Sequence, residues 1–141
     1  MSSPELDKLV EIGQLKAEDP VAGEIEGLRR SGEARLADAR KSDLSLEGRF
    51  DLAYNAAHAL ALAALRRQGY RAANRYVVFQ VLPHTLGLSA AAWRVLAKCH
   101  GVRNRAEYEG SLEVDQRLVS DLIDAASSVL AALGDRDPPR R

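Results

Sequence analysis

The sequence predicts an all-α protein, an up-and-down antiparallel bundle of four to five helices with an N-terminal helical extension. Alanine and leucine dominate its 46% hydrophobic share, and aromatic residues make up only 5%. Such small or unbranched side chains pack between helices at little entropic cost. Apolar residues recur at helical spacing, and short connections make consecutive helices antiparallel neighbours. Only the brief run YVVFQVL reads as strand-like.

The first 32 residues are predicted to form the extension. Ser3 before Pro4 is a helix N-cap followed by a proline in the first turn, and Asp19-Pro20 repeats that signal. The first signal opens a short helix whose apolar face would carry Leu6, Leu9 and Ile12, with Leu15 as a further candidate. The second opens a helix that Gly23, Gly27 and Gly32 weaken in its first half.

Residues 33–134 are predicted to form the helical bundle, and residues 135–141 (DRDPPRR) a disordered tail. The longest predicted helix, LEGRFDLAYNAAHALALAALRRQG, begins after Ser45 and stops at Gly69. Three further helices are predicted after it: a shorter helix in RAANRYVVFQVLPHTLG that ends near Pro83 to Gly87, a helix from Ser89 to Gly110, and a last helix from about Leu112 to Leu133.

The formal net charge is zero, but the charges are segregated along the chain. Residues 52–106 contain no acidic side chain and eight basic ones, whereas the segments before and after this stretch each carry a net charge of −4. The basic residues are Arg66, Arg67, Arg71, Arg75, Arg94, Lys98, Arg103 and Arg105. Arginine suits phosphate and carboxylate oxygens. The pattern therefore predicts either salt bridges to the acidic flanks or a positive cleft for a phosphate-bearing ligand.

Other features narrow the class of protein. No apolar run is long enough to cross a bilayer, and the acidic start MSSPELDKLVE does not resemble a signal peptide, so we expect a cytoplasmic protein. The single cysteine, Cys99, excludes an intrachain disulfide. His58, His84 and His100 lack the spacing of helical metal ligands, and no phosphate-binding loop or catalytic triad is present. We therefore predict no metal and no cofactor.

The candidate ligand-binding residues are Arg103, Asn104, Arg105 and Tyr108, which lie together just before Gly110. On a helix, Asn104 and Tyr108 share one face, and Arg103 points about 100° away from Asn104. Such a cluster can hold an anion at the end of the helix. Alternatively, Arg103 pairs with Glu107, Tyr108 fills the bundle and Asn104 caps a neighbouring element.

The stretch from about Glu33 to Leu133 resembles the HEPN family of helical domains. ARLADARK and RFDLAYNAAHALALAALRRQGYR look like the opening helix pair of that family, and LVSDLIDAASSVLAAL is similar to its closing helix. The long helix that ends in Arg-Asn-x-x-x-Tyr before a glycine resembles the family signature, an arginine followed after a short spacer by histidine or tyrosine.

The resemblance implies a homodimer in which two copies of the arginine motif face one cleft. Many HEPN domains are metal-independent RNA endonucleases, often toxins, and others bind nucleotides or act beside nucleotidyltransferases. If the family motif is transferred to this chain, the resemblance implies that Arg103 holds the phosphate, that Asn104 is its polar companion, and that Tyr108 takes the place of the histidine. A phenol with a pKa near 10 is a poorer general base than imidazole. Arg75-Tyr76 stand where relatives tend to carry another histidine.

Three functions are consistent with these observations. The first is a HEPN-type module that binds RNA or nucleotide phosphates in a dimer cleft, in a toxin–antitoxin or nucleotidyltransferase-associated system. The second is a metal-independent endoribonuclease that uses Arg103 and Tyr108 as catalytic residues. The third is a structural helical protein whose arginines form salt bridges. Trp93, Phe79 and Val78 are candidates for an apolar dimer interface.

Overall fold

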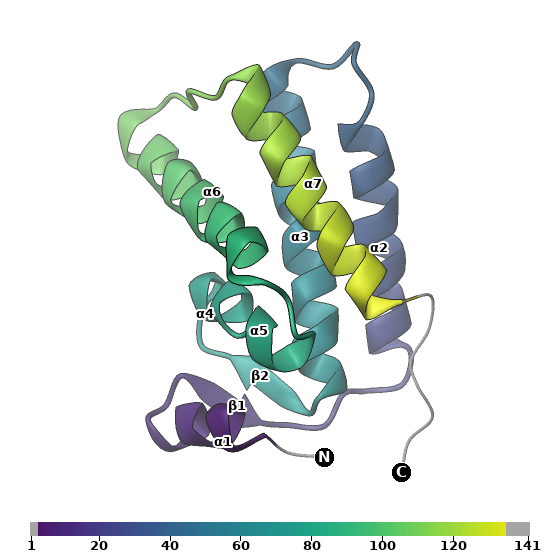
Figure 1. The fold of residues 1–141 in the computed structure, drawn as a ribbon, viewed down its shortest axis with the longest axis vertical. Coiled ribbons are helices and arrows are strands. Elements are labelled where there is room, and N and C mark those ends of the chain that lie inside the picture. The colour runs from purple at the N-terminus through teal and green to yellow at the C-terminus, as the bar shows by residue number, and fades with distance from the viewer. Residues whose placement is uncertain (1–2, 135–141) are drawn as a thin grey trace.

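A computed structural model describes residues 3–134 of the chain (Figure 1). In chain order its elements are α1 (Pro4–Glu11), β1 (Leu15–Ala17), α2 (Glu24–Ala39), α3 (Leu46–Arg67), β2 (Tyr70–Ala72), α4 (Arg75–Gln80), α5 (Leu82–Thr85), α6 (Ala90–Glu109) and α7 (Gln116–Leu133). The four long helices α2, α3, α6 and α7 run alternately up and down (Figure 1). The predicted all-α antiparallel bundle, with its N-terminal helical extension, is confirmed.

Helix α3 is the centre of the core. Ser45 caps its first turn by accepting a hydrogen bond from the backbone N–H of Gly48 at 3.0 Å, as predicted. Buried alanines, leucines and aromatic rings then follow along most of its length. Helix α2 lies close against α3 because Gly32 has no side chain, and a Cβ at this position would lie 2.5 Å from Leu60 Cγ. The glycine that weakens α2 locally is therefore what lets the two helices approach.

Helices α4, α5 and α6 cover the other side of α3. Figure 1 shows α6 tilted relative to α3, with the short helices α4 and α5 near its N-terminal end. Helix α6 ends at Gly110, which adopts a left-handed backbone with φ of 78°. Asp115 then caps α7 by accepting a hydrogen bond from the N–H of Leu118 at 2.8 Å. The aromatic side chains of the core meet where α3, α4 and α6 come together.

The N-terminal extension is tied to the bundle by a small sheet and a buried arginine. Strands β1 and β2 pair antiparallel, with Leu15 opposite Ala72 and Ala17 opposite Tyr70. Arg66, fully buried at the end of α3, donates hydrogen bonds to the Glu24 carboxylate at 2.8 Å and to the Glu18 carbonyl at 2.9 Å. The extension is thus packed on the bundle and contributes Leu6 and Leu15 to the core.

The structure differs from the sequence prediction in four places. The helix predicted in RAANRYVVFQVLPHTLG is present, but it is divided into α4 and α5, and the first residues of that segment belong to β2. Helix α2 begins at Glu24 rather than after Asp19-Pro20, because residues 18–19 bind the end of α3. Helix α7 begins after the Asp115 cap rather than at Leu112. The division expected between residues 32 and 33 falls within α2, and the predicted disordered tail lies outside the described residues.

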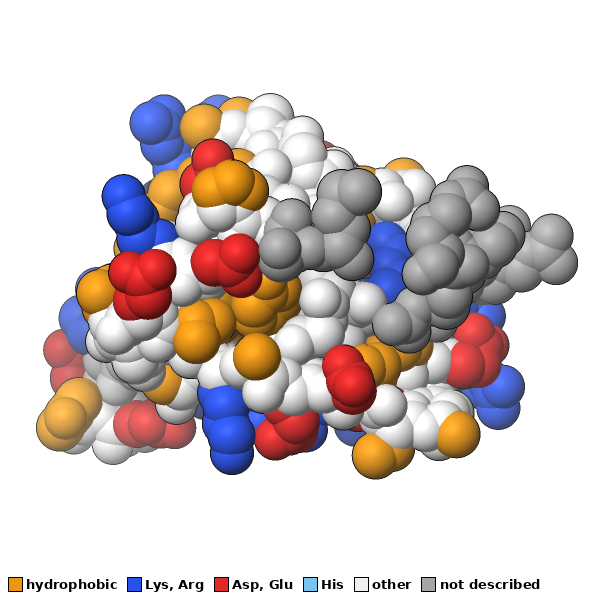
Figure 2. Space-filling model, turned by 90° about the horizontal axis from the view of Figure 1, so that it is seen from below, with side chains coloured by type: hydrophobic (Ala, Val, Ile, Leu, Met, Phe, Trp, Pro, Cys, Tyr) orange, Lys and Arg blue, Asp and Glu red, His pale blue; other side chains and the backbone are white. Residues whose placement is uncertain are grey.

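The end of the molecule that carries α1 and the sheet has a mixed surface. Figure 2 views this end and shows hydrophobic side chains among acidic and basic ones, without a large area of one charge sign. Ile12 and Val21 are exposed, at 65% and 70%. Within residues 3–134, no helix is both long enough and apolar enough to span a bilayer.

Candidate functional site

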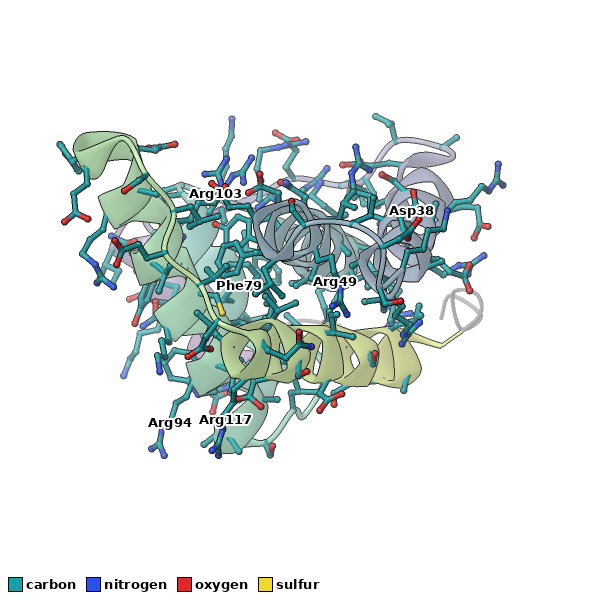
Figure 3. The ribbon with its side chains drawn as sticks, turned by 90° about the horizontal axis from the view of Figure 1, so that it is seen from above. Asp38, Arg49, Phe79, Arg94, Arg103 and Arg117 are labelled. Atoms are coloured by element: carbon teal, nitrogen blue, oxygen red, sulfur yellow. The ribbon has the colours of Figure 1, made fainter. Side chains whose placement is uncertain are left out.

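The most distinctive group of polar side chains lies where α3, α4 and α6 meet. We call it the Tyr54–His100 cluster, and its members are Tyr54 and His58 of α3, Arg75, Tyr76 and Phe79 of α4, and His100, Arg103 and Asn104 of α6. The cluster combines imidazoles, guanidinium groups and aromatic rings. Figure 3 shows Arg103 on the side of α6 that faces the other helices, with Phe79 near it in the interior.

The imidazole of His100 is held at both of its nitrogens. Its Nδ1 lies 3.0 Å from the hydroxyl of the buried Tyr54, and its Nε2 lies 3.1 Å from the amide Nδ2 of Asn104. Because an amide nitrogen donates, this arrangement places the imidazole proton on Nδ1, where it is donated to Tyr54. Rotating the exposed Asn104 amide would instead offer its oxygen to Nε2–H. The two neighbours can therefore accommodate either neutral tautomer.

Two guanidinium groups flank the same aromatic ring. The Cζ atoms of Arg103 and Arg75 lie 5.1 Å and 5.9 Å from the centroid of the Tyr54 ring. Arg103 also pairs with Glu107 at 3.5 Å, as one of the two alternatives predicted. This pair is not sealed from solvent, since the side chains are 31% and 66% exposed. Among residues 3–134, no carboxylate lies within ion-pair distance of Arg75.

The positive charges and the burial of the cluster keep its histidines neutral. Burial, together with the charges of Arg75, His100 and Arg103, lowers the pKa of His58 to about 4. The pKa of His100 is also lowered, first by burial and then by Arg103 and Arg75. Both imidazoles are therefore uncharged at neutral pH. His100 is partly exposed, and its Nε2 lone pair accepts the hydrogen bond from Asn104, so this nitrogen can take up a proton only when that hydrogen bond is broken.

A groove of about 300 Å³ adjoins Arg103 and is lined by no other member of the cluster. It is lined by Arg103 and by three carboxylates, those of Glu47, Asp51 and Glu107. This groove is acidic rather than positive, so it would repel a phosphate. An anion would reach Arg103 more favourably from the side of Arg75 and His100, where the described residues place no carboxylate in an ion pair.

The four predicted ligand-binding residues do not all join one site. Arg103 and Asn104 belong to the Tyr54–His100 cluster, and Asn104 bonds His100 rather than capping a neighbouring element. Arg105 is exposed. Tyr108 is 92% exposed, so it does not fill the bundle. Of the four predicted residues, only Arg103 and Asn104 therefore belong to the cluster.

The other basic side chains of the acid-free stretch are dispersed over the molecule. Arg66 and Arg71 pair with acidic residues of the N-terminal extension, which confirms the salt-bridge alternative for these two. Arg67 donates a hydrogen bond to the Leu133 carbonyl at 3.1 Å. Arg94 projects on the opposite side of the molecule from Arg103 (Figure 3). The block of positive charge in the sequence thus does not become a single positive surface.

Sequence reasoning missed His100, Tyr54 and Arg75 as members of one cluster. The sequence shows only that the histidines lack the spacing of helical metal ligands, whereas in the structure His58 and His100 both lie against the Phe79 ring, with centroids 5.9 Å and 6.4 Å from it. One local signal was present, since His100 and Asn104 have the i, i+4 spacing of neighbours on one helix face. The partnership with Tyr54 and Arg75 has no such signal.

Burial contradicts one further sequence expectation. Val78 and Phe79 are buried in the core at 2% and 0% exposure, so they cannot supply the apolar dimer interface that was predicted for them. Trp93 is only partly buried. Burial raises the pKa of the Cys99 thiol to about 12, which makes it unreactive. Within residues 3–134, no three His, Cys, Asp or Glu side chains gather into a candidate metal site.

Comparison with known proteins yields no relative. No protein-family model, curated protein or solved structure matches the chain.

Proposed function

We propose that this chain is a HEPN-type helical domain that binds the phosphates of RNA or of a nucleotide at the Tyr54–His100 cluster. Arg75 and Arg103 would hold phosphate oxygens, and Asn104 would add a hydrogen bond. Arginine is well suited to this role because its planar guanidinium can donate two parallel hydrogen bonds to one phosphate.

One observation carries the proposal. Two guanidinium groups lie within 6 Å of the same Tyr54 ring, and Arg75 has no carboxylate partner among the described residues. Arg75 is exposed and Arg103 is partly exposed, so both guanidinium groups are accessible to an anion from solvent. The guanidinium of the buried Arg66, in contrast, is fully used by carboxylate and carbonyl partners within the chain.

The ion pair between Arg103 and Glu107 is compatible with this role. It is a solvent-exposed pair within one helix, and such pairs contribute only about 0.3–0.5 kcal/mol. A phosphate with two charge-assisted hydrogen bonds can displace the Glu107 carboxylate. In the proposed bound state Arg103 would turn from Glu107 toward the ligand, so that Glu107 acts as a weak internal competitor.

The family resemblance extends the proposal to an assembly. A homodimer would bring two copies of Arg103 to one cleft, and a nucleotidyltransferase or the antitoxin of a toxin–antitoxin system would be a suitable partner. These elements of the proposal derive from the resemblance alone. Sedimentation of the purified chain tests the dimer directly, because a monomer at micromolar concentration would exclude a composite cleft.

A second candidate function is metal-independent RNA cleavage. The observation that favours it is His100, a partly exposed neutral imidazole one helical turn before Arg103. An imidazole can remove a proton from a ribose hydroxyl at neutral pH, whereas the Tyr108 phenol is a weaker base. In this alternative His100 would take the proton-transfer role that the sequence reasoning gave to Tyr108, and Arg103 would stabilise the phosphate.

Fluorescence anisotropy with a labelled oligouridylate tests the binding proposal. The measurement is made in EDTA at low ionic strength for the wild type, Arg75→Gln, Arg103→Gln and Arg94→Gln. The last variant is the matched control, since it removes the same charge from the opposite side of the molecule. We expect roughly tenfold weaker binding for the first two variants and less than about a twofold change for the control.

Two results would contradict the proposal. Absence of oligouridylate binding at low ionic strength would leave no support for a phosphate site. Equal losses in all three variants would indicate a diffuse electrostatic effect rather than a built site. Gel analysis of the same RNA after incubation in EDTA addresses the second candidate. Cleavage that is abolished in both His100→Asn and Arg103→Gln would establish the nuclease, and an intact RNA would exclude it.

A further inference from the structure

Tyr76 is an exposed aromatic ring at the edge of the proposed phosphate site. It follows Arg75 directly in α4 and is 40% exposed, whereas Tyr54 and Phe79 of the same cluster are fully buried. Its ring lies against the His100 imidazole, with centroids 5.9 Å apart and planes tilted by 53°. Tyr76 therefore has one side fixed by His100 and another side open to solvent.

The surroundings of Tyr76 hold the ring in place. Asn74 caps α4 by accepting a hydrogen bond from the N–H of Val77 at 3.1 Å, which fixes the backbone on either side of Tyr76. Val77 and the two residues after it are buried, so α4 is anchored on the core. A ring fixed in this way loses little conformational entropy when a flat molecule stacks on it.

We infer that Tyr76 is a stacking platform for an unpaired base next to the phosphate held by Arg75 and Arg103. The inference rests on the proposed function and specifies its ligand class, a single-stranded nucleic acid or nucleotide rather than a duplex or a polyphosphate. Arg75 and Tyr76 both reach the Tyr54–His100 cluster, Arg75 over the Tyr54 ring and Tyr76 against the His100 imidazole. Stacking of bases on aromatic side chains beside a basic patch is a general mode of single-strand recognition.

Tyr108 is the other exposed tyrosine of the described chain, and it is a poorer platform. It is 92% exposed, and no ring contact fixes it among residues 3–134. Stacking on such a ring would first have to immobilise it. The two tyrosines therefore provide an internal comparison between a fixed ring and a free one.

The experiment compares oligouridylate with an abasic sugar-phosphate oligomer of the same length and charge, by competition in the anisotropy assay. An RNA duplex of the same length is the third competitor. The proteins are the wild type, Tyr76→Leu, Tyr76→Phe and Tyr108→Leu. We expect the wild type to prefer oligouridylate over the abasic oligomer by roughly tenfold, Tyr76→Leu to lose this preference, and Tyr76→Phe and Tyr108→Leu to keep it.

The outcomes separate this inference from the proposed function. Equal binding of oligouridylate and the abasic oligomer, with both weakened by Arg75→Gln, would overturn the stacking platform and leave the phosphate site intact. A base preference that survives Tyr76→Leu, or that disappears in Tyr108→Leu instead, would overturn the assignment to Tyr76. Preference for the duplex would overturn the ligand class. Absence of binding by every oligomer would overturn the proposed function and the inference together. Circular dichroism of each variant confirms that the helices are retained.

Discussion

Replacing Arg66 by methionine should destabilise the protein strongly. The Arg66 guanidinium is buried at the end of α3, and it joins the Glu18 and Glu24 carboxylates to the backbone carbonyls of residues 18, 19 and 70. Methionine keeps most of the aliphatic volume but donates no hydrogen bond. The change therefore leaves the two carboxylates and the carbonyls without their shared donor, while it creates only a small cavity.

The expected loss of stability is about 3 kcal/mol. Breaking a buried ion pair by removing one partner costs about 3–5 kcal/mol. The lower end applies because the side chains of Glu24 and Glu18 remain 17% and 37% exposed, so water can reach both carboxylates. The backbone carbonyls that lose Arg66 can bond to water instead, so each adds less to the loss of stability than a buried carbonyl without any partner would. For a domain whose total stability is about 5–15 kcal/mol, this is a large fraction.

Urea unfolding followed by circular dichroism measures the effect. With a denaturant slope of about 1–3 kcal/mol per molar, the loss should lower the urea midpoint by roughly 1–3 M. Arg30→Met is the matched control, because Arg30 forms an exposed pair with Glu26 at 3.5 Å and its side chain is 75% exposed. This variant should lie within about 0.5 kcal/mol of the wild type. If Arg66→Met is as stable as Arg30→Met, the N-terminal extension is not held by Arg66 and the reasoning fails.

Two further predictions concern the Tyr54–His100 cluster. Glu107→Gln should strengthen oligouridylate binding by about twofold to fivefold at low ionic strength, because it removes the carboxylate that competes for Arg103. Fluorescence anisotropy measures this change, with Glu11→Gln, at an exposed position, as the control. Unchanged or weaker binding would contradict the role of Glu107 as a competitor. The pKa of His58 is lowered from 6.5 to about 4, so the unfolded state binds a proton more readily than the folded state. The stability that neutral His58 contributes should therefore be full above about pH 6.5 and should be lost as the pH falls toward about 4. His58→Gln should reduce the fall in unfolding free energy between about pH 7 and pH 5, with His84→Gln as the control, whereas a pH dependence identical to that of the wild type would show that His58 is not the group responsible.

Local signals in the sequence predicted the fold class and most helix ends. The Ser3 and Ser45 caps and the Gly110 stop lie where the sequence places them, because a cap depends on residues within one helical turn. The strands could not be predicted in this way. A three-residue strand has no measurable periodicity, and β1 and β2 exist only because the fold brings Leu15 and Ala72 together.

The candidate site was predicted only in part for the same reason. Arg103 and Asn104 were identified because they share a short motif on one helix. Their cluster also depends on Tyr54, which comes from α3, and on Arg75, which comes from α4. No pattern in the sequence near Tyr54 or Arg75 indicates that they lie beside Arg103. The environment of Arg103 is set by the way α6 packs against α3 and α4.

By itself, the sequence determined that this chain is an all-α bundle and that its middle segment carries the excess of arginine. Both properties follow from composition and from the spacing of residues along one helix. Only the tertiary structure decided what each arginine does: Arg66 is neutralised by the N-terminal extension, while Arg75 and Arg103 flank one aromatic ring beside His100. The physical reason is that electrostatic environment depends on distance in space, and the packing of helices sets distances that no spacing along the chain encodes.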